Sequence, residues 1–230
     1  MLAGGQGERL RPIVTGIPKA LAPVGGRPFL AWLLDRLAEA GVENVVLCTG
    51  YLAPQVEQAF GPRYRSLSLA YSPEPRPLDT GGALRLALDR LRGDPLLVLN
   101  GDSFCELDFA AMLDSHRRKR AHATIAVVHR DDAARFGAVS LAADGRVVRF
   151  NEKAAQGAGW INAGVYLLAR QILESLPAGA KISLERDVFP SLAAQGLLYA
   201  YPGVQRFLDI GTPESYRQAE RLAEHWSQPK

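Results

Sequence analysis

A helix pattern followed at once by a strand pattern decides the fold: residues 28–41 read PFLAWLLDRLAEAG, and residues 44–50 read NVVLCTG. In the first stretch, leucines and aromatics recur at three- and four-residue intervals behind a proline, and Gly41 follows, which is typical of an amphipathic helix. The second stretch is a short apolar, β-branched run that ends in glycine, as a buried strand of a parallel sheet does. We therefore predict a helix over residues 28–40 and a buried strand over residues 44–50.

The same alternation returns further along the chain. Residues 80–91 repeat the helical spacing of apolar side chains, and residues 95–99, PLLVL, form another apolar run. Strands that alternate with helices predict right-handed βαβ units. They therefore predict an α/β fold with an open, mostly parallel sheet and helices on both of its faces. Sheets of this kind bind ligands at the carboxyl ends of their strands.

The second half of the chain adds a small antiparallel portion. Residues 137–141 and 146–151 are extended segments joined through Asp144-Gly145, a strong hairpin signal. Further elements are expected as strands at 123–129, 160–168 and 206–210, and as helices at 184–194 and from Thr212-Pro213 onward. No repeat or linker interrupts the pattern, so we predict one domain over residues 1–230. Its first strand is expected to be truncated, because little chain precedes Gly4.

Composition restricts the class of protein. Of 230 residues, 47% are hydrophobic and 22% charged, so the chain can bury a core and is neither disordered nor fibrous. A net charge of +3 favours phosphorylated ligands but does not by itself indicate nucleic acid. The two cysteines lack metal-ligand spacing, and no membrane-length apolar run or signal-peptide pattern is present. We therefore predict a cytoplasmic protein with no membrane or nucleic-acid partner.

The first candidate site is the glycine-rich loop near the start of the chain. Gly4, Gly5 and Gly7 let backbone N–H groups approach a polyphosphate, while Arg9 and Lys19 supply positive charge. The spacing is neither that of a Walker P-loop nor that of a dinucleotide-binding fingerprint. A flexible turn beside solvated basic residues is the alternative interpretation, and the loop alone does not decide between the two.

Two aspartates form the second candidate site. Asp102 directly follows the strand at 95–99, and Asp209 lies among apolar residues near the end of the strand at 206–210. Mg²⁺ takes one or two carboxylates together with phosphate oxygens, and an aspartate in apolar surroundings needs a partner. We therefore predict that Asp102 and Asp209 bind Mg²⁺, with a turn or helix-capping role as the alternative for Asp102.

These residue types suit phosphoryl transfer, which depends on positioning and charge neutralisation rather than on a covalent nucleophile. A sugar phosphate is already an anionic nucleophile and can attack the α-phosphate of a nucleoside triphosphate without a general base. Arg9, Lys19 and Asp102 are accordingly the predicted catalytic residues. Arg9 and Lys19 would stabilise the charge that passes to pyrophosphate, and Asp102 would hold the metal ion.

The sequence resembles the sugar nucleotidyltransferases along nearly its whole length. The matching segments, in family order, are LAGGQGERL at 2–10 with Pro18-Lys19, LDTGGAL at 78–84, NGDSF at 100–104, FNEK at 150–153, INAGVY at 161–166 and FLDIGTPE at 207–214. The resemblance implies a doubly wound, Rossmann-like sheet of the GT-A-like nucleotidyltransferase kind. It also implies an enzyme that joins a nucleoside monophosphate to a sugar 1-phosphate and releases pyrophosphate.

The resemblance further implies roles for individual residues. Glu152, Lys153 and Asn162 would hold the sugar phosphate, and Gly137 would lie close to the sugar. The residues that would bind the nucleotide are Leu2, Ala3, Gly4, Gly5, Gly7, Glu8, Arg9, Lys19, Thr80, Gly81, Gly82, Asn100 and Gly101. For the Glu152-Lys153 pair, an exposed ion pair at the end of a hairpin is the alternative.

Within the family, the resemblance is closest to the D-glycero-D-manno-heptose 1-phosphate guanylyltransferases, which implies GTP and the heptose phosphate as substrates. Mannose 1-phosphate guanylyltransferases stay open, as do hexose or N-acetylmuramate 1-phosphate nucleotidyltransferases that use UTP or dTTP. The truncated first strand and Glu8, which stands where threonine is usual, keep a non-catalytic sugar-nucleotide sensor as an alternative of another class. Asp79 replaces a frequent glycine. Self-association into a homo-oligomer also stays open.

Overall fold

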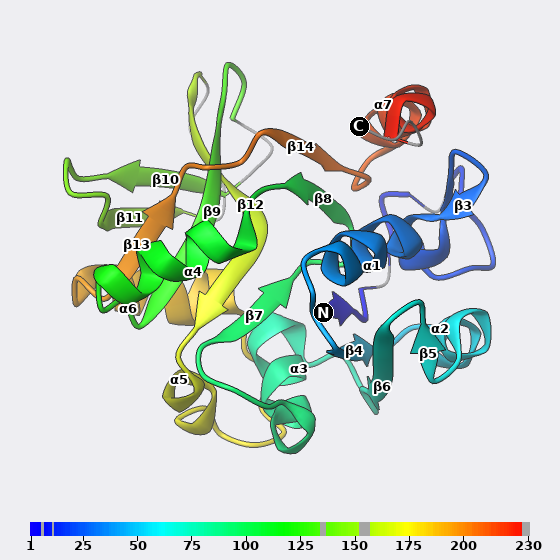
Figure 1. Cartoon of the computed structure of the whole chain (residues 1–230), viewed down its shortest axis with the longest axis horizontal. Helices are drawn as coiled ribbons and strands as arrows, with labels where there is room; N and C mark the ends of the chain where they lie inside the picture. Colours follow the sequence, from blue (N-terminus) through cyan, green and yellow to red (C-terminus); the bar gives the residue numbers. More distant parts are fainter. Residues whose placement is uncertain (6, 11, 134–136, 152–156, 227–230) are drawn as a thin grey trace. The chain divides into compact units, whose positions relative to one another are not determined.

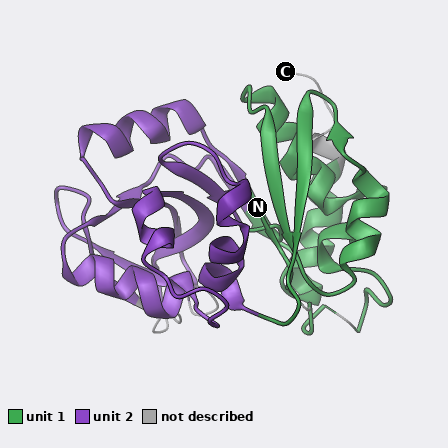
Figure 2. Cartoon of the chain, turned by 90° about the horizontal axis from the view of Figure 1, so that it is seen from below, with its two compact units in different colours: residues 1–77, 100–104, 208–230 green, residues 78–99, 105–207 purple. Residues whose placement is uncertain are grey.

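The computed structural model describes the chain except for residues 6, 11, 134–136, 152–156 and 227–230 (Figure 1). The chain divides into two compact units (Figure 2). Unit 1 contains residues 1–77, 100–104 and 208–230, and unit 2 contains residues 78–99 and 105–207. Each unit combines helices with a β-sheet, so the predicted α/β class is confirmed.

Unit 1 contains a four-stranded sheet in the order β1-β4-β6-β5. β1, β4 and β6 run parallel to one another, and β5 pairs with β6 in the antiparallel direction. The bounds of its main elements are β1 Leu2–Ala3, β4 Asn44–Thr49, β5 Arg63–Tyr64, β6 Leu67–Pro73, α1 Phe29–Glu39, α2 Ala53–Phe60 and α7 Pro213–Trp226. A short ribbon of β2 (Pro23–Val24) and β3 (Arg27–Pro28) precedes α1.

The core of unit 1 explains why its predicted elements form. α1 begins directly after Pro28 and buries its apolar face, with Phe29, Leu30 and Leu34 fully shielded from solvent. β4 is buried from Val45 onward, as expected for a strand covered on both faces. The helix predicted over 28–40 and the strand predicted over 44–50 are therefore both confirmed, within one or two residues at their ends.

Unit 2 contains a six-stranded sheet in the order β11-β10-β12-β9-β13, with β7 also paired to β12. Its pairs are antiparallel except for the parallel pair of β9 and β13. The strands are β7 Leu96–Leu99, β9 Ala123–Arg130, β10 Ala138–Leu141, β11 Val147–Asn151, β12 Gly159–Leu168 and β13 Leu198–Tyr201. The helices are α3 Asp79–Ala87, α4 Phe109–Arg118, α5 Arg170–Glu174 and α6 Phe189–Ala194.

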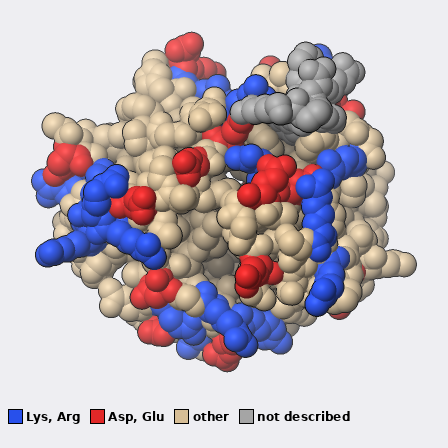
Figure 3. Space-filling model, in the orientation of Figure 1, with Lys and Arg blue, Asp and Glu red and all other residues tan. Residues whose placement is uncertain are grey.

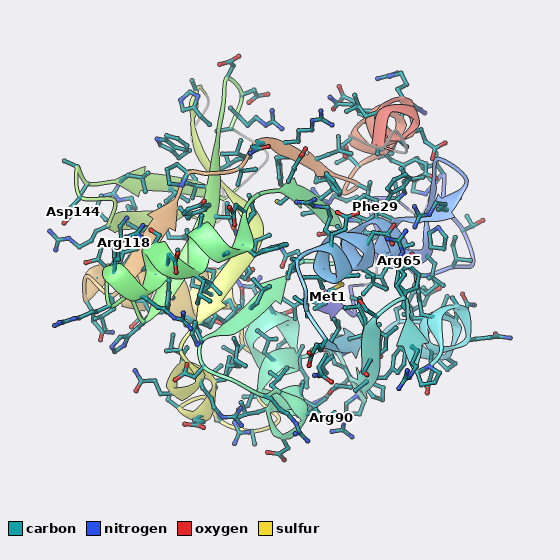
Figure 4. The ribbon with its side chains drawn as sticks, viewed as in Figure 1. Met1, Phe29, Arg65, Arg90, Arg118 and Asp144 are labelled. Carbon is teal, nitrogen blue, oxygen red and sulfur yellow. The ribbon has the colours of Figure 1, made fainter. Side chains whose placement is uncertain are left out.

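The predicted hairpin is formed by β10 and β11, and Asp144 lies at its tip (Figure 4). The Asp144 carboxylate accepts hydrogen bonds from the backbone N–H and the guanidinium of Arg146, which closes the turn. Antiparallel pairing extends beyond this hairpin, because β12 pairs with β7, β9 and β10. The sequence places a strand at 160–168 but gives no direct sign of which neighbours it meets.

Two short strands have residues in both units. β8 (Ser103–Glu106) and β14 (Arg206–Asp209) pair as a two-stranded ribbon. Their ends are tied by backbone hydrogen bonds from Ile210 N to Asp102 O at 2.9 Å, and from Gln205 N to Glu106 O at 2.8 Å. The strand predicted at 206–210 is thus confirmed as β14. Its partner is β8, which directly follows Asp102.

Three features differ from the sequence-based expectation or were not part of it. The helix predicted over 184–194 begins with a π-helical turn, Leu184–Val188, before α6. Asp79 has a φ of +57°, a left-handed conformation that glycine adopts more easily than aspartate. In this chain the Asp79 carboxylate forms ion pairs with Arg186 and Lys181.

The described residues contain no helix that is both long and apolar enough to cross a lipid bilayer. On the face drawn in Figure 3, Lys and Arg side chains are interspersed with Asp and Glu rather than gathered into one basic stripe.

The left-handed backbone at Asp79 generates a stability prediction. Asp79→Ala removes the carboxylate that pairs with Arg186. It also places alanine, which adopts a positive φ less readily than aspartate, at this position, so the free energy of unfolding should fall by about 1–2 kcal/mol. Asp79→Gly loses the same ion pairs but relieves the backbone, and should be about 1 kcal/mol more stable than Asp79→Ala. Urea denaturation measures both differences, and equal stability of the two variants would contradict the backbone argument.

His116 generates a pH-dependence prediction. Its ring is buried, with Nδ1 2.9 Å from Thr124 Oγ1, and burial lowers its pKa below the ordinary value of 6.5, although Asp94 opposes the change. Below about pH 6.5 the unfolded chain therefore binds a proton that the folded chain does not. The free energy of unfolding consequently decreases as the pH is lowered. In His116→Gln this contribution is absent, so the stability gap between wild type and variant should narrow from pH 7.5 to pH 5.5. A constant gap in denaturation experiments would show that His116 is not the cause.

Candidate functional site

The glycine-rich loop turns tightly over Lys19 in unit 1. Gly7 has a φ of +62°, and a Cβ placed on it would lie 3.1 Å from Lys19 Cβ, so glycine serves both the backbone conformation and the close approach. The Gly7 carbonyl accepts a hydrogen bond from Leu10 N at 2.9 Å. Leu10 is 1% exposed and anchors the loop in the core, while Glu8 and Arg9 remain at the surface.

Lys19 and Asp102 form the central ion pair of this loop. Lys19 opens a short 3-10 turn after Pro18, and its Nζ lies 2.7 Å from Asp102 Oδ2. The segment that carries Asp102 is tied to β1, because Gly101 N donates to Leu2 O at 2.8 Å and Leu2 is bridged to Asn100. The predicted residues Leu2, Asn100, Gly101, Asp102 and Lys19 are therefore brought together in unit 1.

Asp209 joins the same group through Gly211. Its Oδ2 accepts hydrogen bonds from Gly211 N at 2.8 Å and from Ser215 Oγ at 3.3 Å. A Cβ placed on Gly211 would lie 2.6 Å from Asp209 Oδ2, 3.4 Å from an Arg9 guanidinium nitrogen and 3.6 Å from Lys19 Nζ. Two cationic side chains and a carboxylate therefore converge within a few ångströms of one point, and Lys19 links them to Asp102. We call Arg9, Lys19, Asp102 and Asp209 the phosphate-site group.

The electrostatics of Asp102 favour its ionised form. Burial raises the pKa of this carboxyl, but the Lys19 ammonium, the Ser103 hydroxyl and the more distant Arg9 guanidinium together hold the pKa below its usual range. Asp102 is thus a carboxylate at neutral pH, with Oδ2 on Lys19 and Oδ1 accepting from Ser103 Oγ at 3.2 Å.

The phosphate-site group fits a divalent metal ion that shares its coordination with phosphate. Among the residues that the structure describes, no three or more His, Cys, Asp and Glu side chains gather as an all-protein metal cage. Magnesium does not need such a cage, since it takes one or two carboxylates and completes its shell with waters and substrate phosphates. Asp102 and Asp209 offer two such carboxylates, and their role as metal ligands stays a prediction.

In unit 2, Asn162 is held by an irregular stretch of β12. The pairing of β12 with β9 shifts register between Asn162 and Tyr166, and Gly164 adopts a φ of +75° within this bulge. Asn162 Oδ1 accepts the Gly164 N–H at 2.9 Å, and Asn162 N donates to Gly137 O at 2.9 Å. Two of the residues predicted to hold the sugar, Gly137 and Asn162, are therefore direct neighbours.

The Thr80-Gly81-Gly82 turn starts α3 and packs tightly against the segment before the π-helical turn. Both Gly81 N and Gly82 N donate to Ile182 O, at 2.8 and 3.0 Å. A Cβ on Gly82 would lie 2.4 Å from Ala180 O, so the small residue is required by this packing. The backbone N–H groups of both glycines are occupied in the chain itself, and a role of this turn in nucleotide binding stays a prediction.

The remaining predicted residues are distributed as follows. Ala3 lies in β1, Gly4 and Gly5 lie in the loop that follows it, and Glu152 and Lys153 fall outside the described residues. Two side chains that were not among the predicted site residues contact residues that were. Glu185 accepts a hydrogen bond from Thr80 Oγ1, and the Tyr166 hydroxyl accepts one from Asn162 Nδ2. The only sequence signal for Glu185 is its place in the acidic first turn after Ser183.

Comparison with known proteins places the chain in a family. The sequence pattern of the nucleotidyl transferase family matches residues 1–225, and the chain belongs to that family. Members of this family generally use a divalent metal ion. The substrates that the family implies are a nucleoside triphosphate and a sugar phosphate.

Two curated relatives and one solved structure are among the most similar proteins. A mannose-1-phosphate guanylyltransferase from Mycobacterium tuberculosis is 40% identical over 220 residues, which cover 94% of this chain but 61% of the relative. A D-glycero-alpha-D-manno-heptose 1-phosphate guanylyltransferase from Aneurinibacillus thermoaerophilus is 35% identical over 226 residues, 98% of each chain. The crystal structure of HddC from Yersinia pseudotuberculosis with GMP-PN superposes with a TM-score of 0.84 at 33% identity, covering 96% of both chains. The Rossmann-like fold of this class is thereby confirmed.

The Lys19–Asp102 pair generates a prediction about ionisation. Lys19→Met removes the ammonium that offsets the burial of Asp102, so the pKa of the Asp102 carboxyl should rise. A pH titration of aspartate carboxyl carbons by NMR follows this change directly. Lys181→Met is the matched control, because Lys181 is exposed and pairs with Asp79 instead. An unchanged Asp102 titration in Lys19→Met would contradict the assignment of Lys19 as its main stabilising charge.

Proposed function

We propose that this chain transfers a nucleoside monophosphate, GMP from GTP, to a sugar 1-phosphate and releases pyrophosphate. The observation that carries the proposal is the phosphate-site group: the Lys19–Asp102 ion pair, with Arg9 and Asp209 beside it, under a glycine-rich loop. The names of its relatives, guanylyltransferases for mannose and heptose phosphates, support the base and the reaction class.

The reaction needs one bond to form and one to break. A phosphate oxygen of the sugar 1-phosphate attacks the α-phosphorus of GTP, and the bond from that phosphorus to the bridging oxygen of the β-phosphate breaks. The products are the nucleoside diphosphate sugar and pyrophosphate. Because the attacking oxygen is already anionic, the protein needs to supply position and positive charge rather than a base.

The phosphate-site group supplies that charge. In this proposal Lys19 and Arg9 neutralise the triphosphate and then the negative charge that gathers on departing pyrophosphate, and the N–H groups of Gly4, Gly5 and Gly7 are assigned to phosphate oxygens. When Mg²⁺ is bound, Asp102 and Asp209 would hold it, and it supplies charge neutralisation for the two reacting anions. The Lys19 ammonium helps to hold the pKa of the Asp102 carboxyl below its usual range, which favours the charged form that a cation needs.

The sugar 1-phosphate is assigned to Asn162 and Gly137, together with Glu152 and Lys153. The side-chain amide of Asn162 is fixed by the Gly164 N–H and the Tyr166 hydroxyl, so its remaining N–H has a defined orientation and can donate to a sugar hydroxyl. D-glycero-D-manno-heptose 1-phosphate is the proposed substrate, supported by the 35% and 31% identity to heptose phosphate guanylyltransferases over almost the whole chain. Mannose 1-phosphate is the competing substrate, supported by the 40% identity to the mycobacterial mannose enzyme. We further propose that the chain acts as one catalytic domain in the cytoplasm.

A substrate panel tests the proposal. Pyrophosphate release is measured with Mg²⁺ for GTP, ATP, UTP, CTP and dTTP, each against heptose, mannose, glucose and N-acetylhexosamine 1-phosphates. We expect selective release with GTP and the heptose phosphate. Selective turnover of mannose 1-phosphate, UTP or dTTP would overturn the substrate assignment but keep the mechanism. A folded protein that binds nucleotide and releases nothing would favour the sugar-nucleotide sensor.

Asp102→Asn tests the mechanism within the same assay. The substitution removes the charge that pairs with Lys19 and that would hold the metal ion, so kcat should fall by about 100-fold or more. Asp114→Asn is the matched control, because Asp114 is exposed on α4 and should leave turnover unchanged. Equal turnover of the two variants would exclude Asp102 from the reaction.

A further inference from the structure

The Glu185 carboxylate lies at the centre of a connected set of hydrogen bonds in unit 2, which links Thr80, Glu185, Tyr166 and Asn162 and which we call the Glu185 relay. Its Oε2 accepts from Thr80 Oγ1 at 2.6 Å and from Ser183 Oγ at 2.9 Å, and its Oε1 accepts from Tyr166 OH at 3.2 Å. These contacts join residues that lie 105 and 19 positions away from Glu185 in the sequence. One carboxylate therefore connects the start of α3 with the bulged strand β12.

The backbone around Glu185 is itself fixed. Ser183 Oγ accepts from Arg186 N at 3.2 Å, and Ser183 N donates to Asp187 Oδ2 at 2.7 Å, a reciprocal cap of the π-helical turn. Leu184 at the start of that turn is fully buried, and its N–H donates to Thr80 Oγ1 at 2.8 Å. Glu185 thus has little freedom to move away from its three partners.

The Glu185 carboxylate also determines which group donates in each hydrogen bond of the Glu185 relay. An ionised carboxylate only accepts, so the hydroxyls of Thr80 and Tyr166 must both donate to it. The Tyr166 oxygen is then left to accept, and it does so from Asn162 Nδ2 at 2.9 Å. Asn162 Oδ1 takes the Gly164 N–H, so the amide cannot turn over without breaking two hydrogen bonds.

We infer that Glu185 is a positioning residue for both substrates: through Tyr166 it orients the amide of Asn162 toward the sugar, and directly it orients the hydroxyl of Thr80 toward the nucleotide. The inference rests on the proposed function. With this polarity, Asn162 offers its remaining N–H as a donor, and Thr80, whose oxygen already accepts from Leu184 N, offers one remaining lone pair as an acceptor. The sugar side therefore selects an accepting oxygen, and the turn at Thr80 selects a donating group of the nucleotide.

Burial makes this relay difficult to replace by water. Tyr166 has no exposed surface, and its ring packs edge-to-face against Phe189 at a centroid distance of 5.0 Å. A hydroxyl enclosed in this way keeps its partners only if they are complementary in donor and acceptor character. If one residue of the Glu185 relay changes from acceptor to donor, the hydrogen bond of its neighbour is therefore disturbed as well, because solvent does not replace the lost partner.

Two variants separate the two branches of the relay. Glu185→Gln puts a donor where an acceptor is required, so the KM for the sugar 1-phosphate and the KM for GTP should each rise about tenfold. Tyr166→Phe cuts only the branch to Asn162 and should raise the KM for the sugar phosphate alone. In both variants kcat should stay within about threefold of wild type, because the interactions concern binding. Glu174→Gln is the matched control, since Glu174 is exposed and forms an ion pair with Arg170.

Combining the variants distinguishes a relay from general damage to the fold. In the double variant Glu185→Gln/Tyr166→Phe, the KM for the sugar phosphate should equal that of either single variant, because both interrupt the same path. Additive effects, or a loss of kcat with unchanged KM values, would overturn the inference. If Glu185→Gln does not fold, Tyr166→Phe alone decides: an unchanged sugar KM or an equal rise in both KM values would also overturn it.

Binding measurements keep this test separate from the test of the proposed function. Calorimetric titration of wild type and Tyr166→Phe with heptose 1-phosphate, mannose 1-phosphate and GTP requires no turnover. A silent wild-type assay would defeat the proposed reaction, while a weaker sugar phosphate affinity in Tyr166→Phe would still support the relay. Equal affinities in the two proteins would defeat the relay even in an active enzyme.

Discussion

The ion pair between Lys19 and Asp102 is the contact on which the proposed phosphate site depends. It joins two residues 83 positions apart, one beneath the glycine-rich loop and one at the end of an apolar strand. Burial raises the pKa of the Asp102 carboxyl, and the Lys19 ammonium, the Ser103 hydroxyl and the Arg9 guanidinium together bring it below its usual range. The loop conformation at Gly7, the pairing of Gly101 with β1 and the position of Asp209 all serve to bring charge to this place.

The two proposed substrate sites use different physical interactions. The phosphate-site group relies on opposite charges held close together, which suits a ligand whose charge changes position during the reaction. The group around Glu185 relies on directional hydrogen bonds in a buried setting, which suits the neutral, polyhydroxylated ring of a sugar phosphate, whose isomers must be distinguished. The phosphate-site group tolerates different phosphate geometries, because attraction between charges depends little on direction. The group around Glu185 is sensitive to the exchange of one hydrogen-bond donor for an acceptor.

Local patterns in the sequence predicted much of the structure, because apolar spacing, turn residues and caps act over a few residues. They placed α1, β4, the β10–β11 hairpin and the start of α7, and the motif residues led to Lys19, Asp102 and Asp209. The position of Asp79 at positive φ, the π-helical turn and the Glu185 relay depend on contacts between distant segments, such as Gly82 against Ala180. No local pattern records which partner a side chain will meet 105 residues away.

The way the chain divides between its two units has a consequence for its synthesis. Unit 1 is assembled from three separate segments, and the last of them begins at Leu208, after the whole of unit 2 has been made. At about 5–20 residues per second, the ribosome needs roughly 5–20 s to pass from Phe104 to Leu208. During that interval Lys19 and Asp102 are already synthesised but Asp209 is not. The nascent chain therefore lacks Asp209, the second carboxylate predicted to bind the metal ion, until the whole of unit 2 has been synthesised.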